Sequence, residues 1–115
     1  MKVQVKRIYD EAESDDGVRV LVDRLWPRGI SKEKAHLDDW AKELASSNEL
    51  RKWYGHDPEC WKEFKSRYAT ELKQHGDALE TLKQKAKGKT LTLLFGSKEE
   101  YLNNAVALKE YLEKY

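Results

Sequence analysis

VRVLVDRLWPRG, at residues 18–29, carries the strongest structural signal in the chain. Its apolar side chains at 18, 20, 21 and 22 follow one another almost continuously, which is typical of a strand covered on both faces. Pro27 has no backbone N–H to give to a sheet, and Gly29 permits a sharp turn. These residues therefore predict a buried strand over residues 18–25 that ends at a polar turn.

Two further strands are expected, one on each side of this stretch. Residues 3–9 alternate apolar Val3 and Val5 with charged neighbours, as a half-buried strand does. An acidic loop of eight residues, 10–17, follows it and is short for a crossover, so an antiparallel first strand is an alternative. Residues 90–95, TLTLLF, are β-branched and apolar and predict a third strand.

Helical signals fill the segment between the second and third strands. Ser31 and Asp57 are suitable N-caps, and Pro58 fits the first position of the longest helix. The apolar stripe of that helix is Trp61, Phe64, Tyr68 and Leu72, which we expect in the core. Predicted helices cover residues 32–36, 37–44, 49–54, 58–75 and 77–87. After the third strand, Ser97 with Glu100 fits a capping box that would open a final helix.

The fold class follows from this order of elements. A connection of about 60 helical residues makes the two strands that it joins parallel. We therefore expect an α/β protein with a small mixed or mostly parallel sheet of about three strands flanked by helices. A length of 115 residues suits one domain, residues 1–115.

Composition argues against several classes of function. The 22 basic and 21 acidic residues give a net charge of +1, which makes a nucleic-acid partner a weak expectation, although a local basic patch is an alternative. The single cysteine, Cys60, excludes an internal disulfide and a cysteine-based zinc site.

The N-terminus has no signal-peptide pattern and no apolar run is long enough for a bilayer, so we expect a cytoplasmic protein away from membranes. No metal or cofactor template is present, and the sequence does not indicate an oligomeric state.

A candidate site lies where the strands end. Ligands of open α/β sheets bind beyond the carboxyl ends of the strands. The second strand ends in Asp23, Arg24, Trp26 and Arg28, and the third ends near Ser97, where a helix N-terminus would attract an anion. The alternative is structural: Asp23 and Arg24 pair with other charges, and Trp26 fills the core.

A second block, residues 51–57, adds Arg51 and His56 to the candidate site. His56 beside Asp57 could be a general base, although Asp57 as a helix cap explains the pair equally well. Cys60 falls in the first turn of the longest helix, where a thiol can be reactive or can be a small packing residue. We expect Arg24, Arg28, Arg51 and His56 to border one pocket.

The chain resembles the YeaO-like family of uncharacterised proteins, a domain of unknown function (DUF 488). The resemblance covers essentially the whole chain and is most specific at residues 17–29, GVRVLVDRLWPRG, and 50–58, LRKWYGHDP. Ser46 stands where the family usually has Pro. Asn104 stands where a His is common, which argues against a catalytic His at that position. The resemblance implies an α/β fold and the location of a site, but no mechanism.

Three classes of function are consistent with this sequence. The first is a small enzyme-like or ligand-binding domain with a pocket for a phosphate or carboxylate anion, which predicts that the candidate residues converge in one concavity. The second is a module that binds nucleic acid or protein through a flat basic surface. The third is a structural or regulatory subunit, which would expose a large apolar patch.

Overall fold

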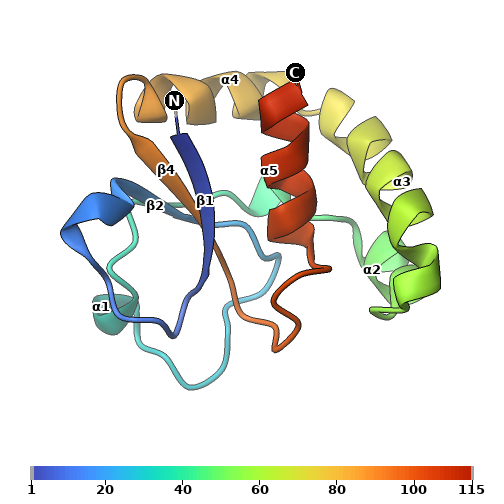
Figure 1. The fold of residues 1–115 in the computed structure, drawn as a ribbon, viewed down its shortest axis with the longest axis horizontal. Coiled ribbons are helices and arrows are strands. Elements are labelled where there is room, and N and C mark those ends of the chain that lie inside the picture. The colour runs from blue at the N-terminus through green and yellow to red at the C-terminus, as the bar shows by residue number, and fades with distance from the viewer. Residues whose placement is uncertain (1, 115) are drawn as a thin grey trace.

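The computed structural model describes residues 2–114, which fold around one four-stranded sheet (Figure 1). Its strands are β1 (Lys2–Arg7), β2 (Val18–Leu21), β3 (Asp39–Trp40) and β4 (Thr90–Phe95). They lie in the order β1-β4-β2-β3, and every neighbouring pair is parallel. The predicted α/β class with a mostly parallel sheet is therefore confirmed.

The position of β1 resolves the alternative that the short acidic loop left open. β1 does not pair with β2. It pairs along its whole length with β4, from Lys2 opposite Thr90 to Arg7 opposite Phe95. Because β4 lies between β1 and β2, the loop passes across β4 and returns the chain in the same direction. The antiparallel alternative for the first strand is wrong.

β3 replaces part of a predicted helix. The spacing of apolar residues predicted a helix through residues 37–44, but this segment holds β3 and a 3₁₀ turn, Lys42–Leu44. The backbone N–H groups of Asp38 and Ala41 donate to the carbonyls of Arg19 and Leu21 on β2. The open edge of a buried strand thus provides hydrogen bonds that outweigh a modest local preference for helix.

The part of the chain that the structure describes also contains five α-helices: α1 (Lys32–Ala35), α2 (Asn48–Tyr54), α3 (Trp61–Lys73), α4 (Gly76–Ala86) and α5 (Asn104–Lys114). Ser31 caps α1 as expected, by accepting from the N–H of Lys34. Asp57 caps a 3₁₀ turn, Pro58–Cys60, that leads directly into α3. The predicted long helix is therefore confirmed, apart from this tighter first turn.

The start of the last helix differs from the prediction. α5 begins at Asn104, seven residues after Ser97. Its cap is Asn103, a buried residue whose Oδ1 accepts from the N–H of Val106 at 3.0 Å. Ser97 instead donates to the carbonyl of Glu99. The expected capping box fails because a buried Asn close to the sheet provides the better cap.

The two faces of the sheet are covered unequally. Leu91, Leu93 and Phe95 of β4 belong to the main core, which also holds the stripe of α3 and the buried side of α5. Leu94 belongs to a smaller core with Ile8, Leu21 and Ala35, and Trp26 and Trp40 pack against it. Figure 1 shows α1 on one side of the sheet, away from α2 and α3. The two central strands, β2 and β4, are buried on both faces, as the almost continuous apolar run of β2 predicted.

A polar cluster lies on the less covered face of the sheet. The Arg19 guanidinium donates to Asp16 at 2.5 Å and to the carbonyls of Ala35 and His36. Lys6 Nζ lies 3.1 Å from the same carboxylate. Only 5% of the Arg19 side chain and 2% of the Asp16 side chain are exposed. Burial acts to raise the pKa of Asp16, but hydrogen bonds from the Glu13 backbone, Lys6 and Arg19 outweigh it and hold the pKa below its usual value.

None of the helices within residues 2–114 is both long enough and apolar enough to cross a membrane.

Candidate functional site

Parallel strands bring their carboxyl ends to one edge of the sheet, and a cavity of about 410 Å³ opens at this edge. All seven residues that the sequence singled out line it: Asp23, Arg24, Trp26, Arg28, Arg51, His56 and Ser97. They come from the loops after β2 and β4, from α2 and from the turn after α2. The expectation that Arg24, Arg28, Arg51 and His56 border one concavity therefore agrees with the structure.

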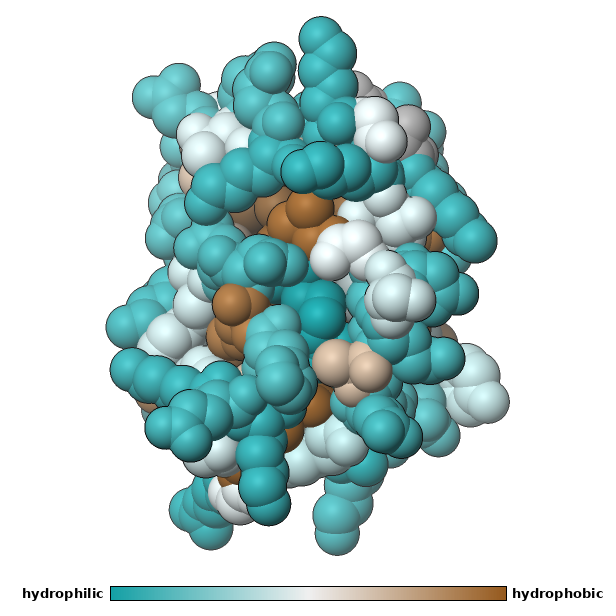
Figure 2. All heavy atoms as spheres, turned by 90° about the vertical axis from the view of Figure 1, so that its left-hand side faces the viewer, coloured by the Kyte–Doolittle hydropathy of each residue, from teal (hydrophilic) through white to brown (hydrophobic). Residues whose placement is uncertain are grey.

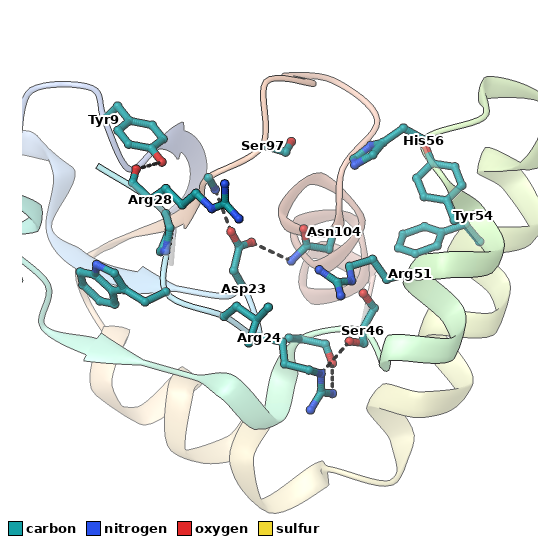
Figure 3. A pocket seen from close by; sticks show the side chains of 16 residues that line it. Tyr9, Asp23, Arg24, Arg28, Ser46, Arg51, Tyr54, His56, Ser97 and Asn104 are labelled. Carbon is teal, nitrogen blue, oxygen red and sulfur yellow. Dashed lines mark hydrogen bonds between the residues drawn. The ribbon is translucent and has the colours of Figure 1, made fainter. Parts of the chain in front are cut away.

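Asp23 lies at the centre of this cavity (Figure 3). Its Oδ2 accepts from the N–H of Gly96 at 2.8 Å, and its Oδ1 accepts from Asn104 Nδ2 at 3.4 Å. Burial raises the pKa of Asp23, and the two hydrogen bonds and the nearby positive charge of Arg51 offset only part of that effect. A carboxylate tied to backbone and amide donors keeps a fixed position in the cavity.

Glycine is required at position 96 for this arrangement. A Cβ atom at Gly96 would lie 2.9 Å from Pro27 Cβ and 3.2 Å from Asp23 Oδ2. The backbone after β4 can therefore approach the turn after β2 closely enough to donate to Asp23. This contact joins the two strand ends that form the floor of the cavity.

Two arginines face the cavity with donors available. Figure 3 shows Arg28 and Arg51 on opposite sides of Asp23, with their guanidinium groups directed toward the space between them. Within residues 2–114 the Arg28 guanidinium forms no hydrogen bond and no ion pair, while its carbonyl accepts from Tyr9 Oη. Arg51 has one long contact, 3.4 Å from Nη2 to Asn48 Oδ1. Both guanidinium groups therefore have N–H donors directed into the cavity.

Arg24 and Trp26 have structural contacts. The Arg24 guanidinium donates to the carbonyls of Ser46 and Ala45, at 3.2 and 3.5 Å, and so holds the segment after β3 against the cavity. Trp26 donates from Nε1 to the Ile30 carbonyl, and its ring meets Trp40 edge to face at a centroid distance of 5.3 Å. These contacts favour a structural role for Arg24 over the expected role as a bidentate donor to an anion.

Ser97 and His56 lie at the mouth of the cavity without forming a catalytic pair. The Ser97 hydroxyl is engaged with the Glu99 carbonyl, so no base activates it within the described chain. His56 is exposed, has a left-handed backbone with φ of 57°, and its ring lies 5.5 Å from that of Tyr54. Asp57, its neighbour, caps the turn before α3, which favours the structural explanation of that pair.

Some of the residues that line the cavity were not among the candidates from the sequence, and Tyr9, Asn104 and Tyr54 are examples. Tyr9 follows β1, and a parallel assignment of that strand would have placed it at the same edge. Asn104 joins α5 to the end of β2 by donating to the Val22 carbonyl at 2.8 Å. Its only sequence signal was the departure from a common His. Tyr54 is 4% exposed and stacks on Phe64, and nothing in the spacing distinguishes it from other core aromatics.

A metal centre is not supported by the described residues. Residues 2–114 contain no group of three or more His, Cys, Asp or Glu side chains placed to hold a metal ion. Cys60 is a free thiol whose pKa is raised by burial and by the carboxylates around it, chiefly Asp57, so a reactive thiolate is disfavoured. The cavity presents guanidinium, amide, hydroxyl and carboxylate groups to its interior.

The fold and this cavity define a small parallel α/β protein with an arginine-flanked pocket at the carboxyl edge of its sheet. The chain belongs to the inactive DUF488-N3 subclade, whose family model matches residues 2–115. It is 45% identical to the uncharacterized protein YeaO of Escherichia coli K12 over 112 residues, which are 97% of each chain. The uncharacterized protein Rv3073c of Mycobacterium tuberculosis H37Rv is 52% identical over 71 residues, 62% of this chain and 60% of the relative. No solved structure matches.

Proposed function

We propose that the protein binds a small anion, with phosphate or carboxylate chemistry, in the cavity at the carboxyl ends of the strands. The observation that carries this proposal is the pair of guanidinium groups of Arg28 and Arg51, which flank one cavity and have donors available. Guanidinium groups bind carboxylate and phosphate oxygens through parallel N–H donors, and such charge-assisted bonds are among the strong ones in proteins.

Other arginines in the same chain show what a structural role looks like. Arg19 is buried and paired with Asp16, and Arg67 donates to Glu63 one turn earlier on α3 while lying over the ring of Trp53. Arg28 and Arg51 have no such carboxylate partner within 4 Å among residues 2–114. The difference supports a role in binding rather than in holding the loops together.

We infer binding without turnover as the activity. The engaged hydroxyl of Ser97 and the exposed, unpaired His56 offer no nucleophile and base within hydrogen-bond reach of each other. The description of the subclade as inactive supports the same proposal. We place the activity in the cytoplasm, which the single free thiol of Cys60 supports.

A structural or regulatory subunit would expose a large apolar patch. The face in Figure 2 is mostly hydrophilic, with small and separate apolar patches. Nothing on this face favours that alternative over a binding pocket.

The test is titration of the protein with inorganic phosphate and with acetate by isothermal calorimetry at low ionic strength. We expect dissociation constants in the millimolar range or below for at least one anion. Arg28→Ala and Arg51→Ala should each weaken binding about tenfold, because a charge-assisted contact is lost. Arg67→Ala is the matched control: it removes one guanidinium outside the cavity and should leave binding unchanged. Heats of dilution only, for both anions, would refute the proposal.

A further inference from the structure

We propose that the natural ligand is a phosphate ester of a polyol, such as a sugar phosphate, with its phosphate on Arg28 and Arg51 and a hydroxyl on Asp23. This inference rests on the proposed anion binding and adds the class of the ligand to it. Three features of the cavity carry it: its size, its central carboxylate, and the balance of charges along its lining.

The size of the cavity exceeds what an inorganic anion needs. A phosphate has five heavy atoms, and even a bulk water molecule occupies only about 30 Å³. The cavity measures about 410 Å³, within the range of roughly 300–1,000 Å³ that is usual for organic ligands. Leu25, which is 63% exposed, and the partly exposed Trp26 add apolar surface to its lining, against which carbon atoms of a ligand can pack. The cavity therefore has room for an organic part of a ligand beside its anion.

The central carboxylate needs a donor from the ligand. An ionised carboxylate can accept about four hydrogen bonds. Asp23 receives one good bond, from the N–H of Gly96, and one long contact from Asn104, whose better bond goes to the Val22 carbonyl. A second anion placed directly on Asp23 would be repelled, whereas a hydroxyl group would donate to it. The ligand that fits carries a hydroxyl near its anion.

The charges of the lining favour a phosphate over a carboxylate and a hydroxyl over an amine. Among the described residues, the lining holds the arginines Arg24, Arg28 and Arg51, and Asp23 is its single carboxylate. A doubly charged phosphate balances this excess of positive charge better than a singly charged carboxylate does. The positive charge of Arg51 acts on Asp23 and offsets part of the rise that burial causes in the Asp23 pKa, so an ammonium group on Asp23 would also meet the Arg51 charge.

The test compares two ligands that differ only in hydroxyl groups. Glycerol 3-phosphate and n-propyl phosphate carry the same phosphate ester on a three-carbon chain, and ribose 5-phosphate extends the series to a sugar. In calorimetry at pH 7 we expect glycerol 3-phosphate to bind at least tenfold tighter than propyl phosphate, and ribose 5-phosphate tighter again. These hydroxyl effects are measured on the parent protein and need no variant.

Asp23→Asn tests the residue. The asparagine keeps an oxygen that accepts from Gly96 and removes a buried charge, so the variant is expected to fold at least as stably as the parent, checked by thermal unfolding. Propyl phosphate should bind it more tightly, since the repulsion is gone, and the advantage of glycerol 3-phosphate should fall below about threefold, as expected when a charged acceptor becomes neutral. Asp77→Asn, at an exposed position in the first turn of α4, removes a carboxylate outside the cavity and should preserve the parent's tenfold ratio.

The possible failures are distinguishable. If inorganic and propyl phosphate bind through Arg28 but glycerol 3-phosphate binds no tighter, the polyol inference is overturned and the anion site stands. If glycerol 3-phosphate is preferred equally by the parent and by Asp23→Asn, the role of Asp23 is overturned and the inference with it. If none of the phosphates binds, the anion site itself fails, and so does everything that rests on it.

Discussion

Replacing Arg19 by methionine breaks the buried polar cluster between the sheet and the acidic loop. Methionine approximates the length of the side chain but removes the guanidinium group. Asp16 then keeps Lys6 as its cationic partner, at 3.1 Å, and loses the 2.5 Å bond from Arg19. The carbonyls of Ala35 and His36 lose their donors from the same side chain.

The magnitude follows from these losses. Removing one member of a buried ion pair costs about 3–5 kcal/mol, because the remaining charge is left without compensation. Lys6 moderates this cost at Asp16, and each carbonyl that loses its donor adds about 1 kcal/mol or more. We expect Arg19→Met to lower the free energy of unfolding by about 4 kcal/mol, a large part of the 5–15 kcal/mol typical of a domain.

Urea unfolding followed by tryptophan fluorescence measures this change. Asp16→Asn and the double variant complete a mutant cycle, in which we expect a coupling of about 2 kcal/mol between the two residues.

The pH dependence of the free energy of unfolding adds an independent check. Because the pKa of Asp16 is lowered by folding, its stabilisation is present above the ordinary value of 3.8 and is lost as the pH falls through the depressed value. Asp16→Asn should remove this acid-induced loss. A cost under about 1 kcal/mol for Arg19→Met, or no coupling in the cycle, would refute the reasoning.

Two further predictions concern α3 and its start. Phe64 is 2% exposed and stacks on Tyr54 with a centroid distance of 4.4 Å, so Phe64→Ala should cost roughly 3–5 kcal/mol in the same urea assay; a loss below about 1 kcal/mol would show that the stripe is not core. Asp57 accepts from the N–H of Glu59 at 3.0 Å, so Asp57→Ala should cost about 1 kcal/mol and Asp57→Asn much less. Equal losses for the two Asp57 variants would mean that the carboxylate charge matters beyond capping, and would restore the pair with His56 as a functional candidate.

Much of the candidate site could be predicted from local sequence because its residues follow strands. Asp23, Arg28 and Ser97 each lie just beyond an apolar run, and the geometry of parallel sheets brings such positions to one edge. Arg51 and His56 were harder, since they reach the cavity through the packing of α2, which depends on the whole core. The Arg24 guanidinium donates hydrogen bonds to the carbonyls of Ala45 and Ser46, and the spacing of residues in the sequence does not predict these bonds.

The sequence by itself determined the class of fold, the buried strands β2 and β4, the cap of α1, the cap before α3 and the apolar stripe of α3. These features depend on periodicity and on local hydrogen bonds, which neighbouring residues specify. Only the tertiary structure decided the direction and partner of β1, the strand at Asp39–Trp40 and the start of α5 at Asn104. Each of these depends on what lies across the sheet: an open edge of β2 for β3, a free edge of β4 for β1, and the end of β2 for Asn104. Such contacts join residues far apart in the chain, so no local pattern of residues predicts their contribution to the free energy of folding.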